Sequence, residues 1–225
     1  MLIGILQTGY APDSLRGSGD YPDMFARLLE GHGFTFRTYR VVDMEFPASA
    51  GDCDGWLITG SRHGTYEDLP FIAPLEHLIR DAFDAGVPVA GICFGHQIMA
   101  QALGGKVEKY RHGWSVGPTE YDFGSESLTL NAWHQDQVTS PPPGARVIAS
   151  SPFCRYAGLA YDNRGLSVQA HPEFSDDFIA GLIDTRGRGV VPDEVLDEAR
   201  ARLGTPLDSA GIAERIAAFF KQNRN

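Results

Sequence analysis

The sequence has few cysteines and no cysteine spacing typical of a disulfide framework or a zinc site. Three cysteines occur in 225 residues, at positions 53, 93 and 154, and none forms a C-x-x-C pair. An odd number of widely spaced cysteines argues against a disulfide-stapled secreted fold and against a zinc knuckle. This usage fits the reducing cytosol, so we expect a cytoplasmic protein.

Long hydrophobic runs and basic clusters are also missing. No apolar stretch approaches the roughly 20 residues that a helix needs to span a bilayer. The apolar start, Met1–Gln7, lacks the basic region and the cleavage site of a signal peptide. The net charge is −10 at pH 7, and the 19 Lys and Arg residues are scattered. We therefore expect neither a nucleic-acid partner nor a membrane partner.

The composition is that of an ordinary globular protein. Hydrophobic residues make up 43% of the chain, which is enough for a sizeable core. The length suits one domain, and the sequence contains no internal repeat and no low-complexity tract. We expect a single domain over residues 1–225, with a C-terminal helical extension over about 174–225.

The first 105 residues alternate between apolar runs and amphipathic stretches. Strands are predicted at Leu2–Leu6, Thr35–Val42, Trp56–Thr59 and Val87–Ile92. Helices are predicted after the capping residue Asp20, over Pro70–Ala85 and over Phe94–Leu103. This order is typical of a largely parallel sheet covered by helices on both faces. The functional loops of such sheets lie beyond the carboxyl ends of the strands.

The second half of the chain has a different pattern. Short β-like segments are predicted at Val107–Tyr110, Ser115–Phe123, Leu128–Leu130, Val147–Ala149, Gly158–Tyr161 and Leu166–Gln169. We interpret them as an antiparallel extension of the same sheet. Three helical stretches follow, at Phe174–Thr185, Asp193–Leu203 and Ser209–Asn223. The apolar stripe of the last predicts docking onto the body of the protein, with an oligomer interface as the alternative. The expected fold class is α/β, a three-layer αβα sandwich with a mostly parallel central sheet and an antiparallel extension.

Cys93 lies between a predicted buried strand and a predicted helix, in Gly91-Ile92-Cys93-Phe94-Gly95. This is the cysteine version of the G-x-S-x-G nucleophile elbow. Such a turn needs small residues two before and two after the nucleophile, because bulk there would clash. The turn also points a helix N-terminus at the sulfur, which favours the thiolate. Most free cysteines are simply buried hydrophobes, but this frame favours a nucleophile.

A thiolate nucleophile needs a base, and that base must be oriented by a third group. His171 and Glu173 follow a predicted strand and are two residues apart, so on an extended chain they point to the same side. Acyl transfer also needs two donors for an oxyanion. The backbone N–H of Phe94 at the helix start is one candidate, and that of Gly60, at another strand end, is the second.

Three motifs together resemble the class I glutamine amidotransferases: Gly-Ile-Cys-Phe-Gly-His-Gln at 91–97, His171-Pro172-Glu173, and Ile58-Thr59-Gly60-Ser61. The sequence is most like their free-standing branch, similar to the glutaminase domain of GMP synthase and to plant γ-glutamyl peptidases. The resemblance covers nearly the whole chain and implies a flavodoxin-like α/β fold. It implies Cys93 as nucleophile, His171 as base and Glu173 as the orienting group. It also implies oxyanion donors at Gly60 and Phe94 and places Gln97 in the glutamyl pocket.

Two stretches depart from the family pattern. Trp133 and His134 fall where the family has another wall of the glutamyl pocket, but the usual glycine is missing from Trp133-His134-Gln135-Asp136. Gly60-Ser61 stands where many members have Gly-Gly-Pro. His96, His134 and His171 could suggest a metal site, but zinc needs three or four convergent ligands and the triad already accounts for His171. We therefore expect no metal and no cofactor.

The expected activity is hydrolysis of the γ-amide of glutamine or of a γ-glutamyl compound through a glutamyl thioester. In the family, ammonia usually passes to a synthase, and this sequence has no G-x-x-x-x-G-K-[ST] phosphate loop. A synthase partner would then be a separate subunit. The main alternative is a γ-glutamyl peptidase acting on γ-linked peptides such as glutathione. A degenerate regulatory or binding subunit and a cysteine protein of a related fold are further alternatives.

Overall fold

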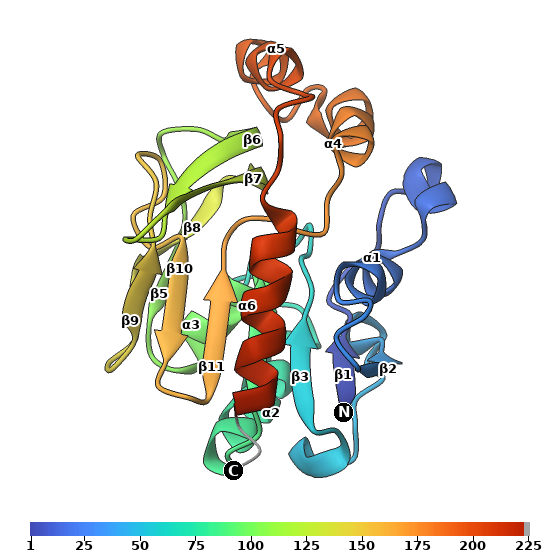
Figure 1. The fold of residues 1–225 in the computed structure, drawn as a ribbon, viewed down its shortest axis with the longest axis vertical. Coiled ribbons are helices and arrows are strands. Elements are labelled where there is room, and N and C mark those ends of the chain that lie inside the picture. The colour runs from blue at the N-terminus through green and yellow to red at the C-terminus, as the bar shows by residue number, and fades with distance from the viewer. Residues whose placement is uncertain (223–225) are drawn as a thin grey trace.

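In the computed structural model, which describes residues 1–222, a seven-stranded sheet forms the centre of the molecule (Figure 1). In spatial order its strands are β2 (Thr35–Tyr39), β1 (Leu2–Leu6), β3 (Gly55–Ile58), β4 (Val89–Ile92), β11 (Gly165–Val168), β10 (Gly158–Tyr161) and β9 (Arg146–Ala149). The first five are parallel to one another, and β10 and β9 pair antiparallel. The predicted mostly parallel sheet with an antiparallel extension is confirmed.

Helices cover both faces of this sheet. α2 (Ile72–Asp84) and α3 (Phe94–Ala102) lie on one face, and α1 (Tyr21–Leu28) and α6 (Ser209–Gln222) lie on the other (Figure 1). Successive side chains of a strand point to opposite faces. Along β3, accordingly, Trp56 and Ile58 pack with α2 and α3, while Leu57 packs with α6. The three predicted layers are therefore present, and α6 docks onto the sheet through its apolar stripe.

The helix boundaries follow from local capping. The side chain of Asp20 accepts a hydrogen bond from the backbone of Tyr21, and the side chain of Asp23 accepts one from the backbone of Asp20, so α1 starts with a capping box. Gly86 ends α2 with a positive φ of 70°, which glycine adopts without steric cost. None of the helices in residues 1–222 combines the length and the apolar character needed to cross a bilayer.

The prediction for residues 106–140 was partly wrong. β5 (Lys106–Lys109) pairs with β8 (Asp136–Ser140), and β6 (Ser115–Asp122) pairs with β7 (Ser127–His134), so neither pair extends the central sheet. The polar sequence of β8 gave no strand signal, and β7 is longer than its apolar core Leu128–Leu130. The eight-residue register of β6 and β7 makes them a ribbon of their own, because most of their hydrogen bonds are satisfied within the pair.

Three other segments differ in detail from the prediction. The second strand ends at Tyr39, because Val41–Asp43 forms a short 3₁₀ helix. The helix expected at Phe174–Thr185 begins after the capping residue Ser175, as α4 (Asp176–Leu182), and continues as a π-helical turn, η4 (Ile183–Gly187). α5 (Asp193–Ala201) follows, and the expected end of the last helix at Asn223 lies outside the described residues. Two further 3₁₀ turns lie at Asp13–Ser18 and Ala50–Asp52.

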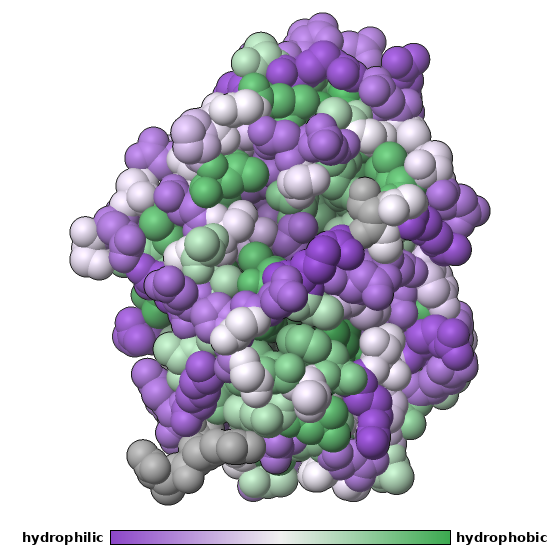
Figure 2. Space-filling view, turned by 45° about the vertical axis from the view of Figure 1, so that its right-hand side comes forward, coloured by the Kyte–Doolittle hydropathy of each residue, from purple (hydrophilic) through white to green (hydrophobic). Residues whose placement is uncertain are grey.

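A third hydrophobic cluster lies beyond the carboxyl edge of the sheet. It combines side chains of α1, α4, η4, α5 and β6, among them Met24, Phe178, Ile183, Leu196 and Val116. Figure 1 shows α4, α5, β6 and β7 above the arrowheads of β3 and β11. In space-filling view, polar residues dominate the upper half of the visible face, and an apolar area lies lower down (Figure 2). The carboxyl edge of the sheet is therefore covered by a cap of later elements.

Two helical glycines provide a test of this packing. A Cβ at Gly95 would lie 2.4 Å from the carbonyl oxygen of Ile58, whereas a Cβ at Gly211 in α6 would meet nothing within 4 Å. We expect Gly95→Ala to lower the free energy of unfolding by about 1–3 kcal/mol, because backbone must move. Gly211→Ala should raise it by up to about 1 kcal/mol through helix propensity. Urea unfolding of both variants measures this, and equal effects would contradict the steric explanation.

Candidate active site

Three parallel strands end side by side at the covered edge of the sheet. In the register of the sheet Ile58 of β3 lies opposite Gly91 of β4, and Val168 of β11 lies opposite Ile92. The backbone N–H of Cys93 still donates to the carbonyl of Val168, at 2.9 Å. The residues that follow these strands are therefore brought together.

The turn at Cys93 has the geometry expected for a nucleophile elbow. Cys93 has φ 53° and ψ −102°, a conformation that L-residues rarely adopt, and α3 begins at the next residue. A Cβ at Gly91 would lie 2.5 Å from the carbonyl oxygen of Gly95, and one at Gly95 would lie 2.4 Å from that of Ile58. Both glycines thus meet the predicted steric requirement. The thiol is nearly buried, at 6% residue exposure.

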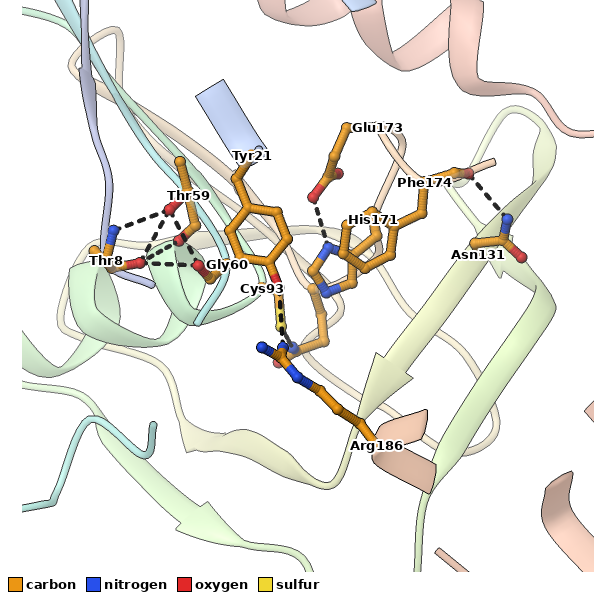
Figure 3. Close-up of polar contacts among 11 residues, drawn as sticks. Thr8, Tyr21, Thr59, Gly60, Cys93, Asn131, His171, Glu173, Phe174 and Arg186 are labelled. Carbon is orange, nitrogen blue, oxygen red and sulfur yellow. Dashed lines mark hydrogen bonds and ion pairs between the residues drawn. The ribbon is translucent and has the colours of Figure 1, made fainter. Parts of the chain in front are cut away.

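His171 is held from three sides. Its Nδ1 donates to Glu173 Oε1 at 2.7 Å, and its ring stacks on Phe174 with centroids 4.0 Å apart and planes 4° apart (Figure 3). Its backbone N–H donates to the carbonyl of Asn131 in β7 at 2.8 Å. The Asn131 side chain in turn donates to the carbonyl of Phe174 at 3.0 Å. The nearness of His171 and Glu173 follows from their spacing, but nothing in the sequence indicates Asn131 or Phe174.

The electrostatics of His171 favour its charged form. Burial alone would lower its pKa, but the negative charges of Cys93 and Glu173, and hydrogen bonds to both, outweigh burial and raise the pKa to about 10. The histidine is therefore an imidazolium at neutral pH. In general, a positive charge beside a cysteine favours its reactive thiolate form.

Two buried threonines orient the peptide group before Gly60. The hydroxyl of Thr8 donates to the carbonyl of Thr59 at 3.0 Å, and it also lies 3.0 Å from the carbonyl of Gly60 (Figure 3). Because the peptide is trans, the N–H of Gly60 points away from the Thr59 carbonyl. A Cβ at Gly60 would lie 2.8 Å from His171 Cε1 and 3.7 Å from Cys93 Cβ. Gly60 therefore lies beside both side chains. No motif in the sequence indicates Thr8.

A cavity of about 410 Å³ opens at Cys93. Five of the residues predicted from the sequence line it: Cys93, Gln97, Trp133, His134 and His171. Gln97 Nε2 donates to the carbonyl of Asp136 at 2.8 Å and to Gln169 Oε1 at 3.1 Å. Gln169 Nε2 lies 3.5 Å from the Cys93 sulfur. A larger groove of about 670 Å³ lies between α6 and β9 and contains none of these predicted residues.

The two remaining histidines of the sequence analysis have different positions. Burial lowers the pKa of His134 to about 3, so it is neutral, and its Nδ1 donates to the carbonyl of Asp136 at 3.2 Å. His96 lies below the cavity, where its Nδ1 shares a hydrogen bond with Ser167 Oγ at 2.8 Å, and burial lowers its pKa to about 4. Within residues 1–222 no group of three or more His, Cys, Asp or Glu side chains could hold a metal ion.

Two more cavity residues escaped the sequence analysis. Tyr21 and Arg186 both line the cavity, and the guanidinium Nη1 donates to the Tyr21 hydroxyl at 3.2 Å (Figure 3). Its Nη2 donates to the carbonyl of Tyr10 at 2.7 Å. Arg186 belongs to η4, a segment that the sequence predicts as plain helix, so its periodicity gave no reason to place it in a site.

Comparison with known proteins identifies the family. Residues 26–177 match the family model described as Glutamine amidotransferase class-I. The chain is 34% identical over 183 residues to Gamma-glutamyl peptidase 4 of Arabidopsis thaliana, covering 74% of this chain and 72% of that protein. It is 35% identical over 185 residues to the glutamine-hydrolyzing GMP synthase of Cupriavidus pinatubonensis, covering 75% of this chain and 32% of that protein.

Solved structures show the same fold. The crystal structure of a glutamine amido transferase from Methylobacillus flagellatus superposes with a TM-score of 0.77 at 24% sequence identity. The superposition covers 99% of this chain and 94% of that one. The family match spans more than half of the sequence and includes Gly60, Cys93, His171 and Glu173. The protein belongs to the class I glutamine amidotransferase family.

Proposed function

We propose that the protein hydrolyses the γ-amide of glutamine or of a γ-glutamyl compound, with Cys93 as its nucleophile. The observation that carries the proposal is that Cys93 and His171 line one cavity, with His171 hydrogen-bonded to the buried Glu173 behind it. Membership of the family supports the same chemistry. A degenerate binding subunit would not need a buried imidazolium beside a cysteine.

In the proposed acylation step the Cys93 thiolate attacks the γ-carbonyl carbon. The negative oxygen of the tetrahedral intermediate is stabilised by the backbone N–H groups of Gly60 and Phe94. Phe94 lies in the first turn of α3, where N–H groups have no acceptor within the helix. His171 gives its proton to the departing amine, the carbon–nitrogen bond breaks, and a glutamyl thioester remains on Cys93.

In the proposed deacylation step His171, now neutral, takes a proton from water as the water attacks the thioester. The tetrahedral intermediate uses the same two N–H groups. Its collapse breaks the carbon–sulfur bond, releases glutamate and restores the thiolate–imidazolium pair. Glu173 orients the ring in both steps, because it holds Nδ1 and leaves Nε2 for proton transfer.

The identity of the leaving amine separates two candidate activities. Gamma-glutamyl peptidases of Arabidopsis thaliana are among the relatives, which favours a γ-linked peptide as substrate. The glutamine-hydrolyzing GMP synthase favours glutamine, but the aligned part covers only 32% of that protein. If glutamine is the substrate, we propose that a separate synthase subunit takes the ammonia.

Cys93→Ser should abolish hydrolysis. We expect glutamate release from L-glutamine and from glutathione to fall by about 10⁴-fold or more, as for loss of other catalytic nucleophiles. Cys53→Ala is the matched control, because Cys53 is another free buried cysteine but does not line the cavity. Mass spectrometry of acid-quenched wild-type protein should detect a glutamyl adduct on Cys93. Undiminished release by Cys93→Ser would contradict the proposed mechanism.

The pH dependence should report the charge of His171. Because folding raises its pKa from 6.5 to about 10, the imidazolium adds stability that is fully present below pH 6.5 and is lost as the pH rises through about 10. The rate should fall over the same alkaline range, since a neutral His171 cannot protonate the leaving amine. We expect kcat/KM to decrease near pH 10.

Removal of Glu173 tests this assignment. Glu173→Gln removes one of the charges that raise the pKa of His171, so the alkaline limb of kcat/KM should move to lower pH. Glu67→Gln is the matched control, because Glu67 lines the same cavity but bonds with His63 and Gly64 instead. An alkaline limb that stays in place in Glu173→Gln would show that His171 does not set it.

A further inference from the structure

Arg186 is a cavity cation without an acidic partner. Within residues 1–222 no carboxylate forms an ion pair with it, and its two hydrogen-bond acceptors, the Tyr21 hydroxyl and the Tyr10 carbonyl, are neutral. The nearby Arg188 and Arg200 both pair with Asp184 instead. An unpaired guanidinium in the cavity of a chain with a net charge of −10 is available for an anionic group of a ligand.

The position of Arg186 is fixed by the residues that hold it. Its Nη1 and Nη2 bond to two different elements, so the plane of the guanidinium cannot turn freely. It is carried by a π-helical turn, and such irregular turns often occur at functional sites. Tyr21, its partner, has a pKa raised to about 12, mainly by burial and despite the nearby guanidinium, and therefore stays neutral. The two groups that hold the guanidinium, the Tyr21 hydroxyl and the Tyr10 carbonyl, therefore do not neutralise its positive charge.

Gln97 and Arg186 line the cavity from different parts of the fold. Gln97 of α3, with its partner Asp136, forms the wall on the α2–α3 side. Arg186 lies in η4 of the cap, and its partner Tyr21 of α1 packs against Phe174 with ring centroids 6.0 Å apart. Phe174 in turn stacks on the His171 ring. Arg186 therefore lies on the side of the cavity where His171 would protonate the leaving amine.

We propose that Arg186 binds the carboxylate of the leaving group, which makes γ-glutamyl amino acids, in which the leaving amino acid carries a free carboxylate, the substrate class of this protein. The inference rests on the proposed function, in which His171 protonates the leaving amine. A leaving amino acid places a carboxylate one carbon from that nitrogen. The ammonia released from glutamine has no such group, so Arg186 selects γ-glutamyl amino acids over glutamine.

The expected selectivity follows from charge-assisted hydrogen bonds. A hydrogen bond to a charged group contributes about 1.5–3 kcal/mol, which corresponds to roughly 10- to 100-fold in kcat/KM. The substrates to compare are γ-glutamyl-alanine, its neutral C-terminal amide, and γ-glutamyl-methylamide, which lacks the group altogether. We expect the wild type to prefer γ-glutamyl-alanine over both neutral compounds by about this factor.

Variants of two neighbouring arginines complete the experiment. Arg186→Gln should lower kcat/KM for γ-glutamyl-alanine by about 10- to 100-fold and leave the two neutral substrates nearly unchanged. Activity on the neutral substrates also shows that the variant is folded. Arg186→Lys should retain part of the preference. Arg188→Gln is the matched control, because Arg188 is exposed, pairs with Asp184, and should leave all three values unchanged.

Three outcomes would overturn the inference. Equal hydrolysis of all three substrates by the wild type would show that no group of the protein recognises the carboxylate of the leaving group. An equal loss on all three in Arg186→Gln would place Arg186 on the glutamyl half of the substrate or in the support of the fold. Failure of Cys93-dependent hydrolysis on every substrate would instead remove the proposed function itself, and the inference with it.

Discussion

The backbone turn at Cys93 is the constraint on which the rest of the site depends. A non-glycine residue at φ 53° and ψ −102° is strained, at a cost of about 1–3 kcal/mol, and persists only where the surroundings hold it. Here the strand before it is paired on both sides, and the helix after it lies close against β3 through Gly95. The strained conformation of Cys93 places its side chain beyond the sheet edge, where it lines the cavity.

Charge burial imposes a second constraint. The side chains of His171 and Glu173 are 4% and 0% exposed, and burying one ion without a partner costs several kcal/mol. Within the described residues the second oxygen of Glu173 has no hydrogen-bond partner, so the imidazolium supplies its main compensation. The side chains of Cys93, His171 and Glu173 thus depend on one another. Loss of any one leaves the others less stable, which ties the chemistry of the site to its folding.

The sequence alone predicted those features that depend on residues close together in the chain. Gly91 and Gly95 flank Cys93 at fixed spacing, and His171 lies two residues from Glu173, so local geometry alone places them. The parallel sheet follows from apolar runs separated by helical stretches. The β6–β7 ribbon was wrongly assigned to the central sheet, because β6 and β7 form most of their backbone hydrogen bonds with each other. The sequence of a strand does not show which strand it pairs with. Thr8, Asn131 and Arg186 were missed for the same reason, since each reaches the site from a distant segment.

The residues proposed for the reaction and the residue proposed for substrate selection lie in different parts of the fold. The proposed nucleophile, base and oxyanion donors all follow the ends of three adjacent strands, and all of them are buried. Arg186 instead lies in the cap, whose cluster of Phe174, Phe178, Ile183 and Leu196 packs as a unit beyond the sheet. Phe174 joins the two parts, because it belongs to that cluster and stacks on His171. A change in the cap can therefore alter which leaving group fits, while the sheet edge keeps the same reaction.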